Sequence, residues 1–183
     1  GLLITEFLCV SEEGLAYPMQ AAIYDDRFIP SLSRLTERIH QNGGKIFAQL
    51  HHGGRMQGKG STSLPAVGAS AIPDASNMIP VHQLGTEEIP GVVQKFLDAA
   101  LRAQKSGFDG VEIHAMHEGY LIDQFAMECF NHRTDQYGGS LENRIRFAVE
   151  IVESIKKACG KDYPVVMRFS SKSFMKDLGK GAV

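Results

Sequence analysis

Cysteine, long apolar runs and an excess of charge of either sign are scarce or missing in this sequence. The cysteines, Cys9, Cys129 and Cys159, are odd in number and widely spaced, and no C-x-x-C pair occurs. Such a set argues against a disulfide framework and against a metal site built from these thiols. We therefore expect three buried, reduced cysteines.

Signals for a membrane, for secretion and for nucleic acid are also absent. No apolar run approaches the roughly 20 residues of a membrane-spanning helix, and the opening GLLITEFLCV has neither the basic leader nor the cleavage site of a secretory signal. The 19 Lys and Arg and 21 Asp and Glu are interspersed and leave a net charge of −2. These absences predict a cytoplasmic protein that acts on a small molecule, without a nucleic-acid or membrane partner; homo-oligomerisation stays open.

The sequence does contain an alternation of strand and helix patterns. Short apolar runs typical of buried strands cover residues 2–6, 45–50, 108–114 and 164–169. Helical periodicity predicts three helices. The first covers residues 31–41. The second follows the possible cap Thr86 and ends at Gly107, and the third follows the cap Ser140 and ends near Gly160. Residues 53–85 are rich in Gly, Ser and Pro and show neither period, which is typical of a functional loop.

Strand and helix alternating four times indicate an α/β fold with right-handed βαβ units and a parallel sheet. A doubly wound sheet would normally show G-x-G-x-x-G or G-x-x-x-x-G-K-[ST] after a strand, and neither occurs. Four strands cannot close a barrel, and the chain begins within an apolar strand and ends within a loop. We therefore expect residues 1–183 to be an internal fragment of a single (β/α)8 TIM-barrel domain, with about four consecutive βα units.

The reactive side chains share one position, the carboxyl ends of the predicted strands. They are Gln49, His51 and His52 on the second strand, His114, His117 and Tyr120 on the third, and Arg168 on the fourth. Active sites of (β/α)8 barrels are built at this end of the strands. The clustering therefore favours catalysis over a purely structural role.

Each of these residues also has a structural interpretation. Gln49 can hydrogen-bond a neighbouring backbone, or its amide can donate and accept at the edge of a flavin ring. Arg168 in an apolar strand needs a partner, either a structural ion pair or an anion such as a reduced flavin ring or a phosphate. His114 and His117 beside Tyr120 favour a site, because imidazole N–H groups polarise a carbonyl and a phenol can donate a proton.

Two further polar patterns have both a chemical and a structural interpretation. The histidines at positions 51, 52, 114 and 117 can in principle converge on zinc, as in barrel hydrolases, but no carboxylate recurs at ligand spacing. The polar run NHRTDQYGGSLENR, residues 131–144, combines a Gly-Gly turn with the cap Ser140. We interpret this run as the punctuation between a loop and a helix.

The most specific signal is a set of motifs that spans nearly the whole chain. FDGVEIHAMHEGYLIDQF and NHRTDQYGGSLENRIRFAVEIV, with GGKIFAQLHHGGR upstream and VVMRFSS downstream, resemble the Old Yellow Enzyme family of FMN-dependent NADH:flavin oxidoreductases. Within that family, the wording H-E-G-Y-L and the ending SSKSFMKDLGKGAV are most similar to clostridial 2-enoate reductases, which are related to bacterial 2,4-dienoyl-CoA reductase.

The resemblance implies FMN at the mouth of the barrel, with Gln49 on the pyrimidine edge of its ring and Arg168 near N1. It also implies that His114 and His117 hold the activating oxygen of the substrate and that Tyr120 supplies a proton. The implied reaction is reduction of an activated C=C bond, in a 2-enoate or an enoyl thioester, with electrons from NAD(P)H. Larger members carry a [4Fe-4S] cluster and FAD outside this segment.

The sequence departs from the family pattern at two places. Glu118 lies between His117 and Gly119, which moves Tyr120 by one residue, so either His117 or Glu118 can be the second substrate contact. Phe7 stands where relatives often have a small residue against the flavin. The alternatives are a flavin-linked dehydrogenase of amines or steroid-like acids, a zinc-dependent barrel hydrolase, and a flavin-binding relic without turnover. We expect the fragment alone to be inactive.

Overall fold

The computed structural model describes residues 1–116 and 119–170, in which helices and strands alternate along the chain. The main elements are β1 (Leu2–Cys9), α1 (Ile29–Gln41), β2 (Lys45–His51), β3 (Ala66–Gly68), β4 (Val81–Gln83), α2 (Ile89–Lys105), β5 (Gly110–Met116), α3 (Leu121–Ala126), α4 (Leu141–Cys159) and β6 (Val165–Phe169). Short 3-10 helices cover Glu12–Gly14, Asp26–Phe28 and Gly54–Met56. His117 lies outside the described residues.

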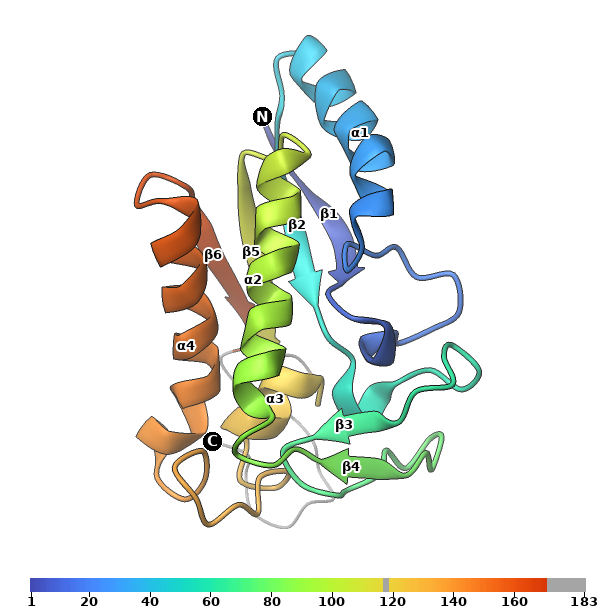
Figure 1. Cartoon of the computed structure of the whole chain (residues 1–183), viewed down its shortest axis with the longest axis vertical. Coiled ribbons are helices and arrows are strands. Elements are labelled where there is room, and N and C mark those ends of the chain that lie inside the picture. Colours follow the sequence, from blue (N-terminus) through green and yellow to red (C-terminus); the bar gives the residue numbers. More distant parts are fainter. Residues whose placement is uncertain (117–118, 171–183) are drawn as a thin grey trace.

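Four strands form one parallel sheet in the order β1-β2-β5-β6. Leu2 pairs with Lys45, Phe47 with Gly110 and Val111 with Val165. Helices α1, α2 and α4 lie on one side of this sheet, and all four strands run toward the end of the molecule where α3, β3 and β4 lie (Figure 1). The predicted parallel α/β arrangement is therefore confirmed.

The apolar core lies between the sheet and its helices. Side chains of the inner strands β2 and β5, such as Leu50 and Ile113, pack against Phe96 of α2 and Phe147 of α4, and all four are fully buried. Burial of apolar surface contributes roughly 25 cal/mol per Å². Truncation of one of these phenylalanines to alanine would cost about 3–5 kcal/mol, because the space it leaves cannot fully close.

The edge strands, by contrast, leave apolar side chains exposed. Leu2 is 54% exposed and Ile4 43% exposed on β1, and Val166 is 41% exposed and Phe169 60% exposed on β6. In a closed (β/α)8 barrel the side of the sheet away from the helices forms the filled interior. The exposed positions are those that such closure would cover.

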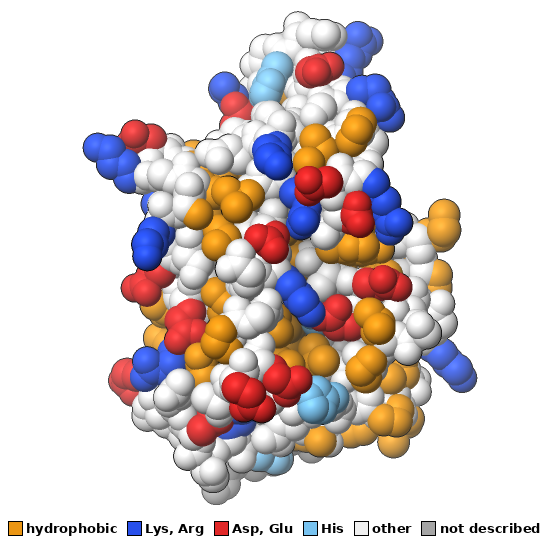
Figure 2. Space-filling view, in the orientation of Figure 1, with side chains coloured by type: hydrophobic (Ala, Val, Ile, Leu, Met, Phe, Trp, Pro, Cys, Tyr) orange, Lys and Arg blue, Asp and Glu red, His pale blue; other side chains and the backbone are white. Residues whose placement is uncertain are grey.

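The helix-covered side carries both signs of charge. In Figure 2 the Lys and Arg side chains are interspersed with Asp and Glu over this face, with no large area of one sign. None of the helices within the described residues is long and apolar enough to cross a membrane.

Two local features differ from the sequence-based expectations. The stretch 53–85 is not wholly irregular, because β3 and β4 form a small parallel sheet within it. Thr86 does not cap α2. Its hydroxyl donates to Asp135 Oδ2 (2.6 Å), and the helix begins at Ile89 with Pro90 in the first turn, where the missing N–H costs nothing.

The expectation of three buried cysteines was right for one of them. All three thiols are free, and Cys9 is buried in β1. Cys129 and Cys159 are partly exposed. The reason is positional, since Cys159 is the last residue of α4 and Cys129 lies in the loop after α3.

Residues 131–144 have the structural role that their turn and cap predicted. Asn131 Nδ2 donates to the carbonyls of Phe125 (2.6 Å) and Tyr137 (2.7 Å). Ser140 Oγ accepts from the backbone N–H of Asn143 at the start of α4 (3.3 Å). The side chains of this run therefore tie α3 and the following loop to α4.

Candidate functional site

Strand register aligns the predicted site residues in rows across the sheet. Gln49 pairs with Glu112, and His114 pairs with Arg168. Paired residues of a parallel ladder point to the same face, and residues two apart on one strand do so as well. Gln49, Glu112, His114 and Arg168 therefore share the face away from the buried helices, near the carboxyl ends of the strands.

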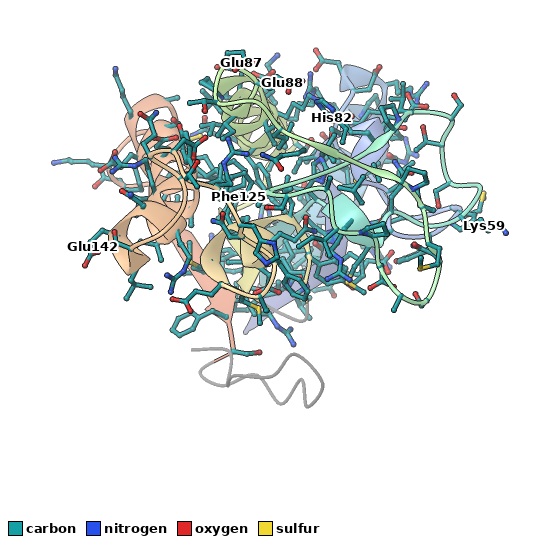
Figure 3. All side chains as sticks on the ribbon, turned by 90° about the horizontal axis from the view of Figure 1, so that it is seen from below. Lys59, His82, Glu87, Glu88, Phe125 and Glu142 are labelled. Carbon is teal, nitrogen blue, oxygen red and sulfur yellow. The ribbon has the colours of Figure 1, made fainter. Side chains whose placement is uncertain are left out.

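Figure 3 looks onto this end of the molecule. Phe125 from α3 lies near the centre of the view, whereas Lys59 and Glu142 lie at opposite margins (Figure 3). Helix α3 follows Tyr120 directly, and its side chains from Leu121 to Phe125 are buried. A packed helix therefore holds the backbone that carries Tyr120.

Gln49 and Glu112 form a buried polar pair. Gln49 is 4% exposed and Glu112 9% exposed. Gln49 Nε2 donates to Glu112 Oε1, while the backbone N–H of Gln49 donates to Thr5 Oγ1 (3.0 Å). Glu112 was not among the residues predicted from the sequence, although a carboxylate inside the apolar run FDGVEIH was a signal for it.

Three aromatic rings gather around His51. The His51 ring stacks on Phe7, with centroids 4.5 Å apart and planes 25° apart, and lies 5.6 Å from the ring of His114. The Tyr120 ring is 4.4 Å from His51 and 5.3 Å from His114. The structure thus brings the predicted residues His114 and Tyr120 together, with Phe7 and His51 as neighbours.

His51 is buried and has no hydrogen-bond partner among the described residues. Its side chain is 0% exposed, and within residues 1–116 and 119–170 neither ring nitrogen has a partner. Burial lowers the pKa of His51 well below its usual value of 6.5, and the nearby His114 and His52 act in the same direction. A neutral imidazole offers one donor and one acceptor, so His51 can bind a polar ligand group of either kind.

His52 is not part of this ring cluster and instead contacts Gly54 and Glu13. His52 Nδ1 accepts from the backbone N–H of Gly54 (3.0 Å), and Nε2 lies 3.7 Å from Glu13 Oε1. Glu13 is also paired with Lys95 of α2. Burial alone would raise the pKa of Glu13, but His52 and Lys95 outweigh it and hold that pKa below its usual range.

The zinc alternative gains no support from these positions. The rings of His51 and His114 are stacked, with their planes 24° apart. No group of three or more His, Cys, Asp or Glu side chains in the described part of the chain is placed to hold a metal ion.

Arg168 lies beside His114, but it is not buried as its apolar strand had predicted. Its side chain is exposed, because β6 is an edge strand of the sheet. No described residue forms an ion pair with Arg168. Within the described residues, its guanidinium group is therefore open to an anion.

Comparison with known proteins decides the family. The profile of the NADH:flavin oxidoreductase / NADH oxidase family matches residues 1–182. The chain belongs to this family. It is 52% identical over 160 residues to a cinnamate reductase of Clostridium sporogenes, which covers 85% of this chain and 24% of that protein.

Two further relatives agree with this assignment. An NADH oxidase of Thermoanaerobacter brockii is 42% identical over 177 residues, which covers 96% of this chain and 27% of that protein. The structure of an old yellow enzyme homologue from Zymomonas mobilis superposes with a TM-score of 0.87 and 36% identity, over 94% of this chain and 50% of that one. The partial (β/α)8 barrel is therefore confirmed, and the chain spans about a quarter of the length of these two curated relatives.

The residues present fit a flavin. The pyrimidine edge of a flavin presents an N–H between two carbonyl oxygens, and Gln49 can meet it because no described residue donates to its Oε1. Arg168 adds an exposed cation on the same face. His51 adds two ring nitrogens without partners in the described residues. These groups can hold a planar, polar-edged cofactor and a substrate carbonyl side by side.

Proposed function

We propose that this chain supplies part of an FMN site and catalyses NAD(P)H-dependent reduction of an activated C=C bond. The observation that carries the proposal is the convergence of the Tyr120 phenol with the imidazoles of His51 and His114 beside Gln49. A cinnamate reductase and an NADH oxidase among the relatives support it. Cinnamate is a 2-enoate, so we assign the substrate to the class of 2-enoates or enoyl thioesters.

In this proposal Gln49 and Arg168 hold the cofactor. Gln49 Oε1 accepts from the pyrimidine edge, and Arg168 places a permanent positive charge beside the ring. Bound FMN supplies the two-electron transfer from NAD(P)H to the alkene. The side chains orient both partners of the reaction and exclude water from the end of the sheet.

The remaining residues act on the substrate. His114 donates a hydrogen bond to the activating carbonyl oxygen, which draws electron density away from the C=C bond. Tyr120 donates its phenolic proton to Cα and recovers a proton from solvent afterwards. The second contact to the carbonyl oxygen comes from His117 or Glu118, both of which lie outside the described residues.

The proposal extends to the whole protein. Residues 1–183 form an internal part of a single FMN-binding barrel domain, and this part is inactive alone. The protein is cytoplasmic and has a small alkene as its partner, and a homo-oligomer is a further prediction. The FAD and [4Fe-4S] centres that the resemblance implies would lie outside this segment.

One anaerobic experiment on the full-length protein tests this function. The purified protein should carry stoichiometric FMN, lose its flavin absorbance when NADH is added, and regain it when cinnamate or an enoyl thioester follows. A colourless protein with stoichiometric metal would overturn the proposal in favour of a hydrolase. A flavin that NADH bleaches and no alkene restores would also overturn it.

A further inference from the structure

Glu112 is a buried carboxylate whose partner Gln49 is uncharged, an arrangement that stability alone does not favour. Glu112 is 9% exposed, yet its only described hydrogen-bond partner is the neutral amide of Gln49, and none of the described cations forms an ion pair with it. Burial of a carboxylate costs free energy unless it is well paired. Places where a chain breaks this rule tend to be functional.

Strand register sets the meeting of these two side chains. Gln49 and Glu112 are direct partners on β2 and β5, while their neighbours Ala48, Leu50 and Ile113 enter the core beneath the helices. Both polar side chains therefore project from the opposite face. Glu112 is two residues before His114 on β5, so both side chains lie on this face.

The hydrogen bond to Glu112 fixes the orientation of the Gln49 amide. A glutamine amide has a donor end and an acceptor end of nearly the same shape, and its partner decides which end points where. Glu112 accepts from Nε2. The acceptor end, Oε1, is then the atom that Gln49 offers to a ligand.

We propose that Glu112 is a positioning residue that sets the hydrogen-bond polarity of Gln49, so that the site accepts a cofactor ring with an N–H donor at this edge. The inference rests on the proposed function, because the ring concerned is that of FMN. Glu112 acts through Gln49 and needs no contact with the cofactor. A ring that is alkylated at this N–H should be rejected.

The experiment compares two cofactors on the full-length apoprotein. FMN and 3-methyl-FMN, whose methyl group replaces the pyrimidine N–H, are titrated by quenching of flavin fluorescence. Wild type should prefer FMN by about ten-fold or more, since an unpaired buried acceptor costs roughly 1–3 kcal/mol and 1.4 kcal/mol corresponds to ten-fold. Glu112→Leu frees the amide to turn, and the preference should fall to about two-fold or less.

Three further variants separate positioning from a general disturbance. Glu112→Gln can accept from Gln49 or donate to it, so its preference should lie between those of wild type and Glu112→Leu. In the Gln49→Leu background, Glu112→Leu should change the preference no further. The matched control is Glu150→Gln on α4, a carboxylate that accepts from Tyr137 on the outer layer (3.0 Å), and it should keep the wild-type preference.

The outcomes distinguish this inference from the proposed function. If wild type binds no FMN, both are overturned. If wild type binds FMN and Glu112→Leu keeps the wild-type preference while its apoprotein melts normally, only the positioning role is overturned. An effect of Glu112→Leu that persists in full without Gln49 would also overturn it. Should Glu112→Leu fail to fold, an unchanged preference in Glu112→Gln decides against the inference.

Discussion

The phenol ring of Tyr120 stands edge-on to the buried imidazole of His51, with ring centroids 4.4 Å apart and planes at 70°. Tyr120 is the residue before α3, and His51 ends β2, so two elements far apart in the sequence fix this pair. The phenol is half-buried beside an imidazole that burial keeps neutral. A neutral neighbour is compatible with the role of proton donor that we propose for Tyr120.

Tyr120→Phe should separate the two half-reactions of the full-length enzyme. The substitution removes one hydroxyl and keeps the ring, so NADH should still bleach the flavin at the wild-type rate. Reoxidation by the alkene should slow by about 10²–10⁴-fold, the range typical of a lost general acid. Tyr163→Phe, at the other end of β6, is the control and should change neither rate. Stopped-flow absorbance measures both, and a loss below about ten-fold would assign the proton to another group or to water.

Arg168→Ala should weaken FMN binding and make the flavin harder to reduce. Arg168 is a permanent cation that forms no ion pair with a described residue. A cation beside the flavin ring stabilises the negative charge that the ring gains on reduction. We expect the affinity for FMN to fall by about ten-fold or more, since a hydrogen bond to a charged group contributes about 1.5–3 kcal/mol and 1.4 kcal/mol corresponds to ten-fold. Gln49→Ala should weaken binding as well. Potentiometry and fluorescence titration measure the effects, with Arg34→Ala on the exposed side of α1 as the control.

Stability of the protein should fall as the pH drops below about 6.5. The pKa of His51 lies well below its usual value of 6.5 in the folded state, and that of His52 is lowered too, mainly by burial. The unfolded chain therefore takes up these protons first, so stability is complete above pH 6.5 and is lost as the pH falls toward the folded pKa values.

His51→Phe should flatten this pH dependence, since the variant keeps an aromatic ring against Phe7 and has no group to titrate. Urea unfolding of the full-length protein between pH 5 and pH 8 provides the measurement. An equal slope in wild type and variant would show that the pKa of His51 is the same in the folded and unfolded states, and would contradict this prediction.

Arg133→Ala should destabilise the protein more than any exposed arginine does. Arg133 Nη1 donates to the carbonyls of Ala69 (3.1 Å) and Leu84 (2.5 Å), and its guanidinium is paired with Asp135. Loss of a buried charged partner costs about 3–5 kcal/mol. Arg133→Lys should not restore stability, because an ammonium group lacks the planar fork. Arg146→Ala, on the exposed side of α4, should change the free energy of unfolding by about 0.5 kcal/mol or less.

Residues 1–183 expressed alone should aggregate and should not retain stoichiometric FMN. Leu2 and Phe169 are more than half exposed on the edge strands, and unpaired strand edges template association. Phosphate sites of (β/α)8 barrels usually lie after strands seven and eight, beyond the four strands of this sheet. A soluble monomer with a cooperative melt and tightly bound FMN, seen by light scattering and absorbance, would contradict the fragment interpretation.

The sequence by itself determined the order of the elements. Helix α4 was predicted closely because its signals are local, with Ser140 at its start and Gly160, which has φ +94°, at its end. Strands β2 and β6 were also predicted to within a residue at each end, since a short apolar run bounded by Gly or Pro has few other readings. Family motifs within the same chain then predicted site roles for Gln49, His114 and Tyr120, which stay predictions.

Only the tertiary structure decided which side chains meet. The pair of Gln49 and Glu112 follows from strand register, and the ring cluster around His51 follows from the way α3 returns to the end of β2. Exposure of Arg168 depends on its place in an edge strand, which no local pattern records. Helix α3 and strands β3 and β4 span six, three and three residues, too short to show a period, and packing alone stabilises them. Sequence periodicity reports on residues that are close along the chain, so it predicts helices and strands. The site is formed by residues that are far apart in the sequence, so only the tertiary structure shows which of them meet.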